Sequence, residues 1–229
     1  MKIIKCLSVL LLLPVTLWAE NRVFTGEARS LSDGRLLYRE THTLQLDSDR
    51  PISGVVEYHD AEGVLIARKT NQYHERLATT DFVLMDMRND YREQAQQTES
   101  GWRLSQTENG KSTSADPGQP EHQPVVDAGF DEFVREHWQA LLDDQTIFFS
   151  FAVPARLEWI SFRLIPVRVT DTELTVEMKL RSRMLAWLLD PIILTYDLKT
   201  RQLLRYRGLT NIQDENGKGI HAEITYHYD

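Results

Sequence analysis

A hydrophobic pattern with a period of two residues is the feature of this 229-residue chain that most constrains its fold. The stretch "ELTVEMKLRS" alternates apolar and polar residues from Leu174 onward, and the terminal "HAEITYHYD" alternates in the same way. Successive side chains of a strand point to opposite faces of a sheet, so each stretch predicts a strand with one buried face and one solvated face. The stretch "LEWISFRL" is apolar at positions on both faces, which predicts a more deeply buried strand.

Turn signals separate the alternating stretches at short intervals. They lie at Asp33-Gly34, His59–Val64, Asn109-Gly110, Val169–Leu174, Asp197–Gln202 and Asn216-Gly217. Asn-Gly and Asp-Gly pairs tolerate the positive φ that tight hairpins require. Most gaps are too short for the helical crossover that joins parallel strands. The sequence therefore predicts a mainly β fold, a curved antiparallel β-meander that forms an open half-barrel.

One amphipathic helix is predicted within "VVDAGFDEFVREHWQALLDD", which begins at Val125. Asp127 is a candidate N-cap, and Asp131 and Glu132 suit the positive end of the helix dipole. We expect the helix to pack on the sheet or to plug the mouth of a curled one. Its apolar face consists of Phe130, Phe133, Val134, Trp138, Leu141 and Leu142.

The stretch "ENGKSTSADPGQPEHQP" is rich in Ser, Pro, Gly and polar residues and predicts a flexible loop at about 108–125. It separates a β region at about 22–111 from a helix-plus-β region at about 125–229. Neither region shows a self-contained core, so we expect a single domain over 20–229 with one continuous sheet. The alternative is two small domains.

The N-terminus has the organisation of a signal peptide over residues 1–19. Lys2 and Lys5 precede an apolar run from Leu7 to Trp18, and Ala19 is a small residue at a plausible cleavage site. As a helix this run reaches only about 18 Å, short of the roughly 30 Å hydrocarbon core. We therefore expect a periplasmic or secreted protein with no transmembrane helix after cleavage. The alternative is an uncleaved N-terminal anchor.

Cysteine content and charge narrow the function classes. Cys6 is the only cysteine and lies inside the predicted signal, so the mature chain would have no disulfide, thiolate nucleophile or cysteine metal site. The net charge of −8 becomes more negative when Lys2 and Lys5 are removed. An acidic protein repels phosphate backbones, so nucleic acid is not an expected partner.

No motif predicts a cofactor, a metal or a catalytic centre. His221 and His227 share a predicted strand face but lie about 20 Å apart, too far to ligate one ion. "DENGKG" at Asp214–Gly219 resembles a calcium loop without its distant Glu, so we interpret it as a hairpin turn. Nucleotide-binding loops and the GxSxG elbow are missing from the sequence. A hydrolase with dispersed catalytic residues stays an alternative.

Two further stretches allow two interpretations each. "DFVLMDMRNDYRE" at Asp81–Glu93 places carboxylates close together, which suits acid–base chemistry, but we favour an outer strand face with cross-strand ion pairs. "RMLAWLLDPIILTYD" at Arg183–Asp197 predicts a strand buried on both faces, or an apolar lip that touches a membrane or a ligand.

A curled sheet with many large apolar residues can enclose a ligand cavity. The candidate lining residues are Phe149, Trp159, Phe162 and Trp187. The alternative is that these residues fill the core.

The order of signal, meander, helix and further meander resembles the periplasmic LolA/LolB-like half-barrel and other bacterial periplasmic β proteins of unknown function. The stretches "VVDAGFDEFVREHW" and "DPIILTYDLKTRQLLRYRGLTNI" carry the resemblance. It implies an unclosed antiparallel sheet wrapped over helices and the carriage of lipid. The chain departs from those families in having one strong helix and no lipid-attachment cysteine at the mature start, and no functional residue is transferred.

Three hypotheses follow. The first is a non-enzymatic protein that binds an apolar, lipid-like ligand or a cell-envelope partner on its concave face. The second is a hydrolase, which needs a histidine within hydrogen-bond reach of a carboxylate and a hydroxyl. The third is a structural or assembly factor, which would have a solid core and a flat apolar patch.

Overall fold

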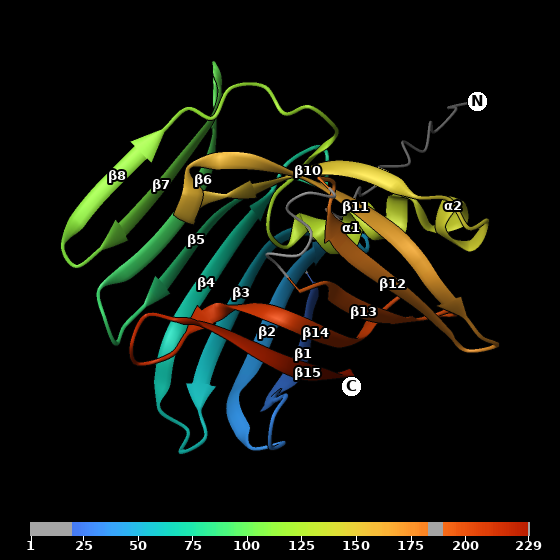
Figure 1. Ribbon diagram of the computed structural model, residues 1–229, viewed down its shortest axis with the longest axis horizontal. Helices are drawn as coiled ribbons and strands as arrows, with labels where there is room; N and C mark the ends of the chain where they lie inside the picture. Colours follow the sequence, from blue (N-terminus) through green and yellow to red (C-terminus); the bar gives the residue numbers. More distant parts are fainter. Residues whose placement is uncertain (1–19, 183–189, 229) are drawn as a thin grey trace, which may run out of the picture.

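The computed structural model describes residues 20–182 and 190–228 (Figure 1). The predicted signal peptide over 1–19 lies outside the described residues. So does the run 183–189, which includes Trp187 and the first seven of the fifteen residues at Arg183–Asp197 for which a doubly buried strand or an apolar lip is predicted.

The described residues form one sheet of 15 strands, two short helices and a 3-10 turn. The strands of the N-terminal half are β1 (Glu20–Ser30), β2 (Leu36–Asp47), β3 (Arg50–Asp60), β4 (Leu65–Tyr73), β5 (Thr80–Asp86), β6 (Tyr91–Thr98), β7 (Gly101–Glu108) and β8 (Lys111–Ala115). The elements of the C-terminal half are β9 (Pro124–Val125), α1 (Gly129–Glu136), α2 (Trp138–Leu142), β10 (Ile147–Val153), η1 (Pro154–Arg156), β11 (Glu158–Val169), β12 (Glu173–Leu180), β13 (Ile192–Asp197), β14 (Leu203–Gln213) and β15 (Gly219–Tyr228).

Two meanders meet at the middle of the sheet. The strand order is β8-β7-β6-β5-β4-β3-β2-β1-β15-β14-β13-β12-β11-β10-β9, so the first and last strands of the chain pair with each other. This β1–β15 pair runs antiparallel from Phe24↔Tyr228 to Ser30↔Ala222. The short β9 is the one parallel addition among the described strands. The predicted curved antiparallel meander, a sheet that does not close, is confirmed.

The connection between the two outer strands forces the sheet to curl. β8 and β9 lie at opposite edges, yet only residues 116–123 join them. Fifteen strands laid flat would be roughly 65 Å wide, whereas this connection spans at most about 30 Å. The two edges must therefore approach each other, and Figure 1 shows the C-terminal half crossing in front of the N-terminal half.

Aromatic side chains mark the place where the two edges meet. Trp102 on β7 lies edge-on to Trp159 on β11, with ring centroids 5.9 Å apart. The Trp159 indole Nε1–H also donates to the carbonyl oxygen of Gly118 in the connection, at 3.1 Å. The segment expected to be a loop at about 108–125 thus contains the Asn109-Gly110 turn, β8, this connection and β9.

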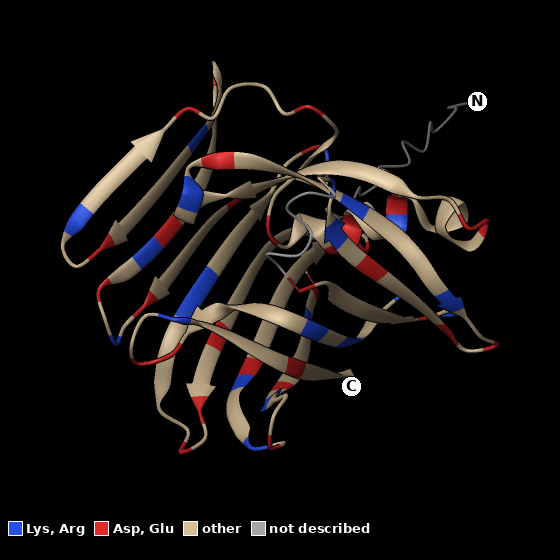
Figure 2. Cartoon of the chain, viewed as in Figure 1, with Lys and Arg blue, Asp and Glu red and all other residues tan. Residues whose placement is uncertain are grey.

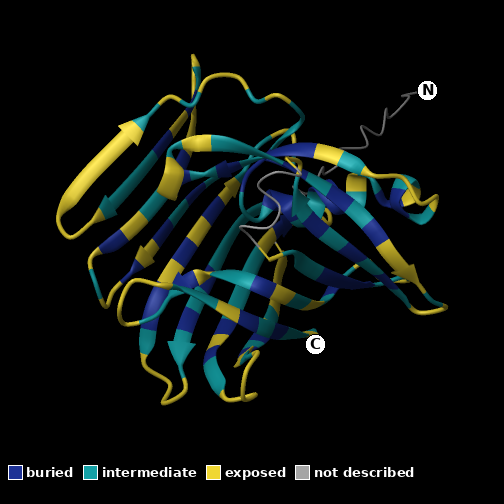
Figure 3. Cartoon of the chain, in the orientation of Figure 1, coloured by how far each residue is buried: buried dark blue, intermediate teal, exposed yellow. Residues whose placement is uncertain are grey.

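The alternating pattern produces two apolar cores, and Figure 3 shows burial alternating along the strands. The inter-half core joins strands of both halves through residues that include Tyr38, Tyr58, Leu84, Leu104, Ala152 and Ile212. The helix core joins the helices to β10–β13 through residues that include Phe133, Leu141, Phe149, Leu164, Leu174 and Tyr196. At about 1.5–3 kcal/mol for each large side chain, both cores contribute strongly to stability.

The six predicted turns are confirmed. At one of them, Asn109 and Gly110 have φ of 51° and 72°, the positive pair that a tight two-residue hairpin requires. The predicted single strand face across Asp81–Glu93 is wrong. β5 ends at Asp86 and β6 begins at Tyr91, because the chain turns over residues 87–90, where Asp90 has a φ of 51°.

The predicted single helix is two short helices that share the predicted apolar face. The break falls at His137, whose φ of −99° and ψ of 15° end α1 before α2 begins at Trp138. The His137 ring Nδ1 lies 3.0 Å from the carbonyl oxygen of Phe133, so the ring occupies the end of the first helix. Phe130, Phe133 and the other predicted apolar residues still face the helix core, with Leu142 partly buried.

The predicted N-cap is also wrong. Ala128 occupies the N-cap position of α1 and makes no side-chain capping bond. Asp127 has a left-handed backbone with φ of 43°, and its carboxylate turns away from the helix toward Lys69 and Asn71 on β4. Sequence spacing does not reveal this long-range attraction, which competes with local capping.

Within residues 20–182 and 190–228, the helices are too short to cross a membrane.

We predict that Gly129→Ala destabilises the fold, because α1 begins against the loop between β4 and β5. A β-carbon at position 129 would lie 2.2 Å from the carbonyl oxygen of Ala78, so backbone must move. Overpacking of this kind costs about 1–3 kcal/mol, measurable as a lower urea midpoint. Gly54→Ala is the matched control, since its β-carbon would make an ordinary 3.5 Å contact with Leu44. Equal midpoints for the two variants would contradict the close approach.

Candidate functional site

A cavity of about 1430 Å³ lies between the two halves of the curled sheet. Strands β1–β4 line one side, α1 borders it, and β10–β15 line the other side. Representative apolar lining residues are Phe24, Leu44, Phe130, Ile160, Phe162 and Leu194. Ligand pockets usually measure about 300–1,000 Å³, so this space is large enough for a ligand with a long apolar body.

A buried ion pair joins the two halves at the edge of the cavity. Lys69 Nζ on β4 lies 3.0 Å from the carboxylate of Asp127, and their side chains are only 10% and 7% exposed. The Asn71 amide donates to the same carboxylate at 2.9 Å, and the Asn211 amide of β14 reaches it at 3.4 Å. Burial alone would lower the pKa of Lys69, but the attraction of Asp127 outweighs it and raises the pKa. This cluster positions the start of α1 and β14 over β4.

A second pair of polar residues, Glu40 and His42, lies on β2 among aromatic side chains. The His42 ring Nε2 is 2.7 Å from the carboxylate of Glu40, which is 5% exposed. The His42 ring stacks on Phe24 with centroids 4.3 Å apart, and Tyr226 approaches it edge-on at 5.7 Å. Burial first, and then the negative charge of Glu40, raise the pKa of the Tyr226 phenol, which keeps it a neutral hydroxyl. His42, Phe24 and Tyr226 all line the cavity.

Helix α1 presents charged groups to the same space. Asp131 accepts a hydrogen bond from the Tyr196 hydroxyl at 2.9 Å. Glu132 pairs with Arg135 at 2.6 Å. Burial raises the pKa of Glu132 even though Arg135 opposes the shift, so the protein holds this carboxylate at a cost in free energy.

Each Lys or Arg that lines the cavity has a carboxylate partner. We call these five residues the paired cations: Arg22, Lys69, Arg135, Arg156 and Arg181. Their partners are Asp49 at 3.5 Å, Asp127 at 3.0 Å, Glu132 at 2.6 Å, Glu158 at 2.8 Å and Glu121. Figure 2 shows the two signs interspersed over the sheet. The cavity therefore presents no uncompensated cation among the described residues.

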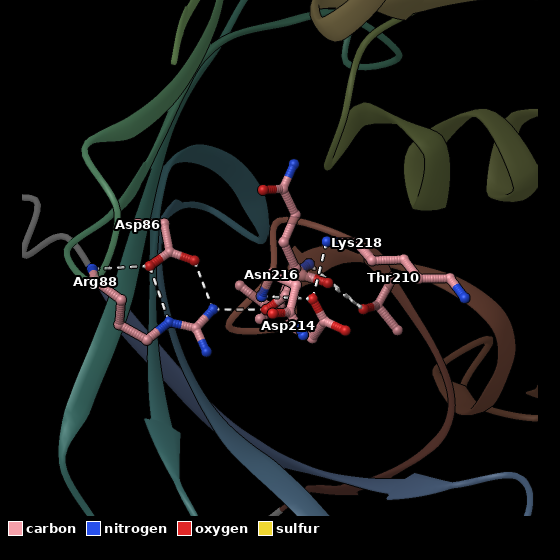
Figure 4. Close-up of polar contacts among 8 residues, drawn as sticks. Asp86, Arg88, Thr210, Asp214, Asn216 and Lys218 are labelled. Atoms are coloured by element: carbon pink, nitrogen blue, oxygen red, sulfur yellow. Dashed lines mark hydrogen bonds and ion pairs between the residues drawn. The ribbon is translucent and has the colours of Figure 1, made fainter. Parts of the chain in front are cut away.

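The tip of the β14–β15 hairpin is tied to the turn between β5 and β6 (Figure 4). Arg88 donates two side-chain hydrogen bonds to Asp86, at 3.0 and 2.6 Å. It also donates to the carbonyl oxygen of Gln213 at 2.7 Å. The adjoining turn is closed by Asp214, which accepts from the backbone N–H groups of Asn216 and Lys218 at 2.9 Å. The "DENGKG" stretch is thus a hairpin turn, as predicted.

The four predicted lining residues have different locations. Trp159 and Phe162 line the cavity. Phe149 is fully buried in the helix core and is not among the lining residues. Trp187 lies outside the described residues. The structure therefore places two of the four at the candidate site.

Sequence reasoning missed the polar residues of the cavity. Lys69 and Asn71 occupy the inward positions of "LIARKTNQY", between the buried Ala67 and the cavity-lining Tyr73. Glu40 and His42 occupy inward positions of β2 in the same way. The available signal was a polar residue at a strand position where the alternation calls for an apolar one. Such a residue faces the interior, and buried polar groups need specific partners.

Among the described residues, no histidine ring hydrogen-bonds to both a carboxylate and a Ser or Thr hydroxyl. His42 and His74 each lie within 2.9 Å of a carboxylate, Glu40 and Asp81 respectively. No Ser or Thr hydroxyl bonds to either ring within the described ranges. Over the same ranges, no three His, Cys, Asp or Glu residues cluster as metal ligands.

Comparisons with protein-family models, curated proteins and solved structures give no match for this chain.

We predict that Arg88→Met loosens the hairpin tip and lowers the free energy of unfolding by about 2–3 kcal/mol. Asp86 would lose its side-chain partner while its own side chain is only 3% exposed. Arg92→Met, which removes an exposed arginine from the next strand, is the control and should change stability by less than about 0.5 kcal/mol. Urea unfolding of both variants gives the comparison, and similar losses would show that the Arg88 contacts are unimportant.

We predict that Lys69→Met lowers the free energy of unfolding more than Arg88→Met does, because it leaves Asp127 buried without its cation. Breaking a buried pair by removing one partner costs about 3–5 kcal/mol. Arg68→Met on the same strand is the control, because Arg68 lies 4.0 Å from Glu57 and both side chains are about half exposed. Thermal unfolding at neutral pH measures the difference. A Lys69→Met protein as stable as Arg68→Met would show that the buried ion pair contributes little to stability.

Proposed function

We propose that this protein binds an apolar or amphipathic, lipid-like small molecule in the cavity between the halves of its sheet and is not an enzyme. The observation that carries the proposal is the cavity itself, about 1430 Å³ in volume and lined by residues such as Phe24, Leu44 and Phe162. A protein that needed only a stable core would gain dispersion contacts by filling this space.

The shape of the fold supports this function over the alternatives. A structural factor with a solid core would not need a space of this size between its halves. A triad hydrolase would need a Ser or Thr hydroxyl beside a carboxylate-paired histidine, and no described Ser or Thr hydroxyl bonds to the His42 or His74 ring. The curved, unclosed sheet suits the lipid carriage implied by the LolA/LolB resemblance. Binding to a cell-envelope protein is compatible with the same role, since a carrier must receive and deliver its ligand.

We also propose that residues 1–19 are a cleaved signal peptide and that the protein works in the periplasm or outside the cell. Lys2, Lys5 and the apolar run to Trp18 support this location. A lipid-like ligand is consistent with it, because poorly soluble molecules need a carrier to cross an aqueous compartment.

We predict that Leu44→Trp reduces the binding of an apolar probe at least tenfold, because the larger ring occupies the cavity that Leu44 lines. Delipidated protein is titrated with N-phenyl-1-naphthylamine, whose fluorescence rises in apolar surroundings. Val64→Trp is the matched control, since Val64 is 59% exposed and is not among the cavity-lining residues.

The wild type and Val64→Trp should bind the probe alike. Absence of probe binding by the folded wild type would sink the proposed function. Equal binding by Leu44→Trp would place the apolar site elsewhere on the molecule.

A further inference from the structure

We infer that the ligand carries an uncharged head group with a hydroxyl, and that His42 accepts a hydrogen bond from that hydroxyl. The inference deepens the proposed function and rests on it. It comes from two independent features of the cavity, the hydrogen bonding of His42 and the pairing of the lining charges.

The contact with Glu40 fixes which His42 nitrogen is free. A carboxylate only accepts hydrogen bonds, so the nitrogen 2.7 Å from Glu40, Nε2, is the one that donates. In the neutral imidazole the other nitrogen, Nδ1, is then an acceptor. Nδ1 makes no hydrogen bond to any residue in the described ranges, although His42 lines the cavity. With the His42 ring in its neutral form, a ligand group that completes this site is therefore a hydrogen-bond donor.

The surroundings of His42 make that hydrogen bond selective. Phe24 covers one face of the ring at 4.3 Å and Tyr226 lies edge-on to it. In such an apolar wall, water is a poor substitute for a lost partner. A site built to bond a hydroxyl rejects an analogue without one far better than an apolar pocket rejects an extra methylene. The Tyr226 hydroxyl also makes no hydrogen bond within the described part of the chain, so this wall offers a neutral donor beside the acceptor.

The charges of the lining argue against an ionic head group. An anionic head would have to displace a carboxylate from one of the paired cations, which include Lys69 and Arg135. A cationic head would have to compete with the same cations for their carboxylates. Asp131 is the lining acid outside those pairs, and it already accepts the Tyr196 hydroxyl at 2.9 Å. Displacing the partner of Lys69 or Arg135 leaves a buried or half-buried charge unpaired, which is costly. The pairs of Arg22, Arg156 and Arg181 are about half exposed or more and oppose an ionic head group only weakly.

The test compares head groups on one acyl or alkyl chain of twelve carbons. Delipidated protein loaded with N-phenyl-1-naphthylamine is titrated with 1-lauroylglycerol, methyl laurate, laurate and dodecylammonium. We expect 1-lauroylglycerol to displace the probe about five- to tenfold more tightly than each of the others. Methyl laurate is the key comparison, because it is uncharged but has no hydrogen-bond donor.

The matched variants are His42→Phe and His227→Phe. His227 is an exposed histidine on β15 that does not line the cavity. His42→Phe should weaken the binding of 1-lauroylglycerol about tenfold and leave the binding of methyl laurate unchanged. His227→Phe should change the binding of neither compound.

Three results would overturn the inference. The wild type could bind methyl laurate as tightly as 1-lauroylglycerol, or it could bind either ionic amphiphile as tightly. The third is that His42→Phe keeps the wild-type preference for 1-lauroylglycerol over methyl laurate. If His42→Phe does not fold, the wild-type ranking alone decides. Failure of the probe and of all four amphiphiles to bind would instead reject the proposed function.

Discussion

The short connection between β8 and β9 is the constraint on which the rest of the structure depends. Residues 116–123 join the two outer edges of a sheet that would be far wider if it were flat. A sheet with one apolar face must also cover that face, and two short helices are too small to do so alone. Curling solves both problems, because the C-terminal half covers the N-terminal half and the edges meet at Trp102 and Trp159.

Curling leaves a space that side chains do not fill, and polar contacts join the two halves around it in a fixed geometry. The Lys69–Asp127 pair fixes the start of α1 over β4, while Arg88 ties the β14–β15 tip to the turn after β5. Buried ion pairs are seldom the most stable solution, but they specify one arrangement when each charge is satisfied. The cavity is therefore a consequence of long-range contacts that secure the two halves at defined points.

The fold class and the turns could be predicted from sequence because both are local. Alternation from Leu174 onward and the Asn109-Gly110 pair act over a few residues, and their physics does not change with the surroundings. Asp127 could not be placed, because its partners Lys69 and Asn71 lie far along the chain. The turn after Asp86 is local, but the alternation across Asp81–Glu93 continues through it and concealed it. The same holds for the site. Trp159 and Phe162 could be predicted because they are large apolar residues. The pairing of Glu40 with His42 and of Lys69 with Asp127 depends on which strands face the cavity, which the sequence does not show.

Native mass spectrometry tests the central claim that the cavity holds a small amphipathic molecule. The protein would be purified without detergent from the cells that produce it, incubated with their total lipid extract and measured under gentle ionisation. The account predicts a non-covalent adduct that is lost on denaturation and identified as an amphiphile with an uncharged, hydroxyl-bearing head. A bare polypeptide mass after that incubation would contradict it.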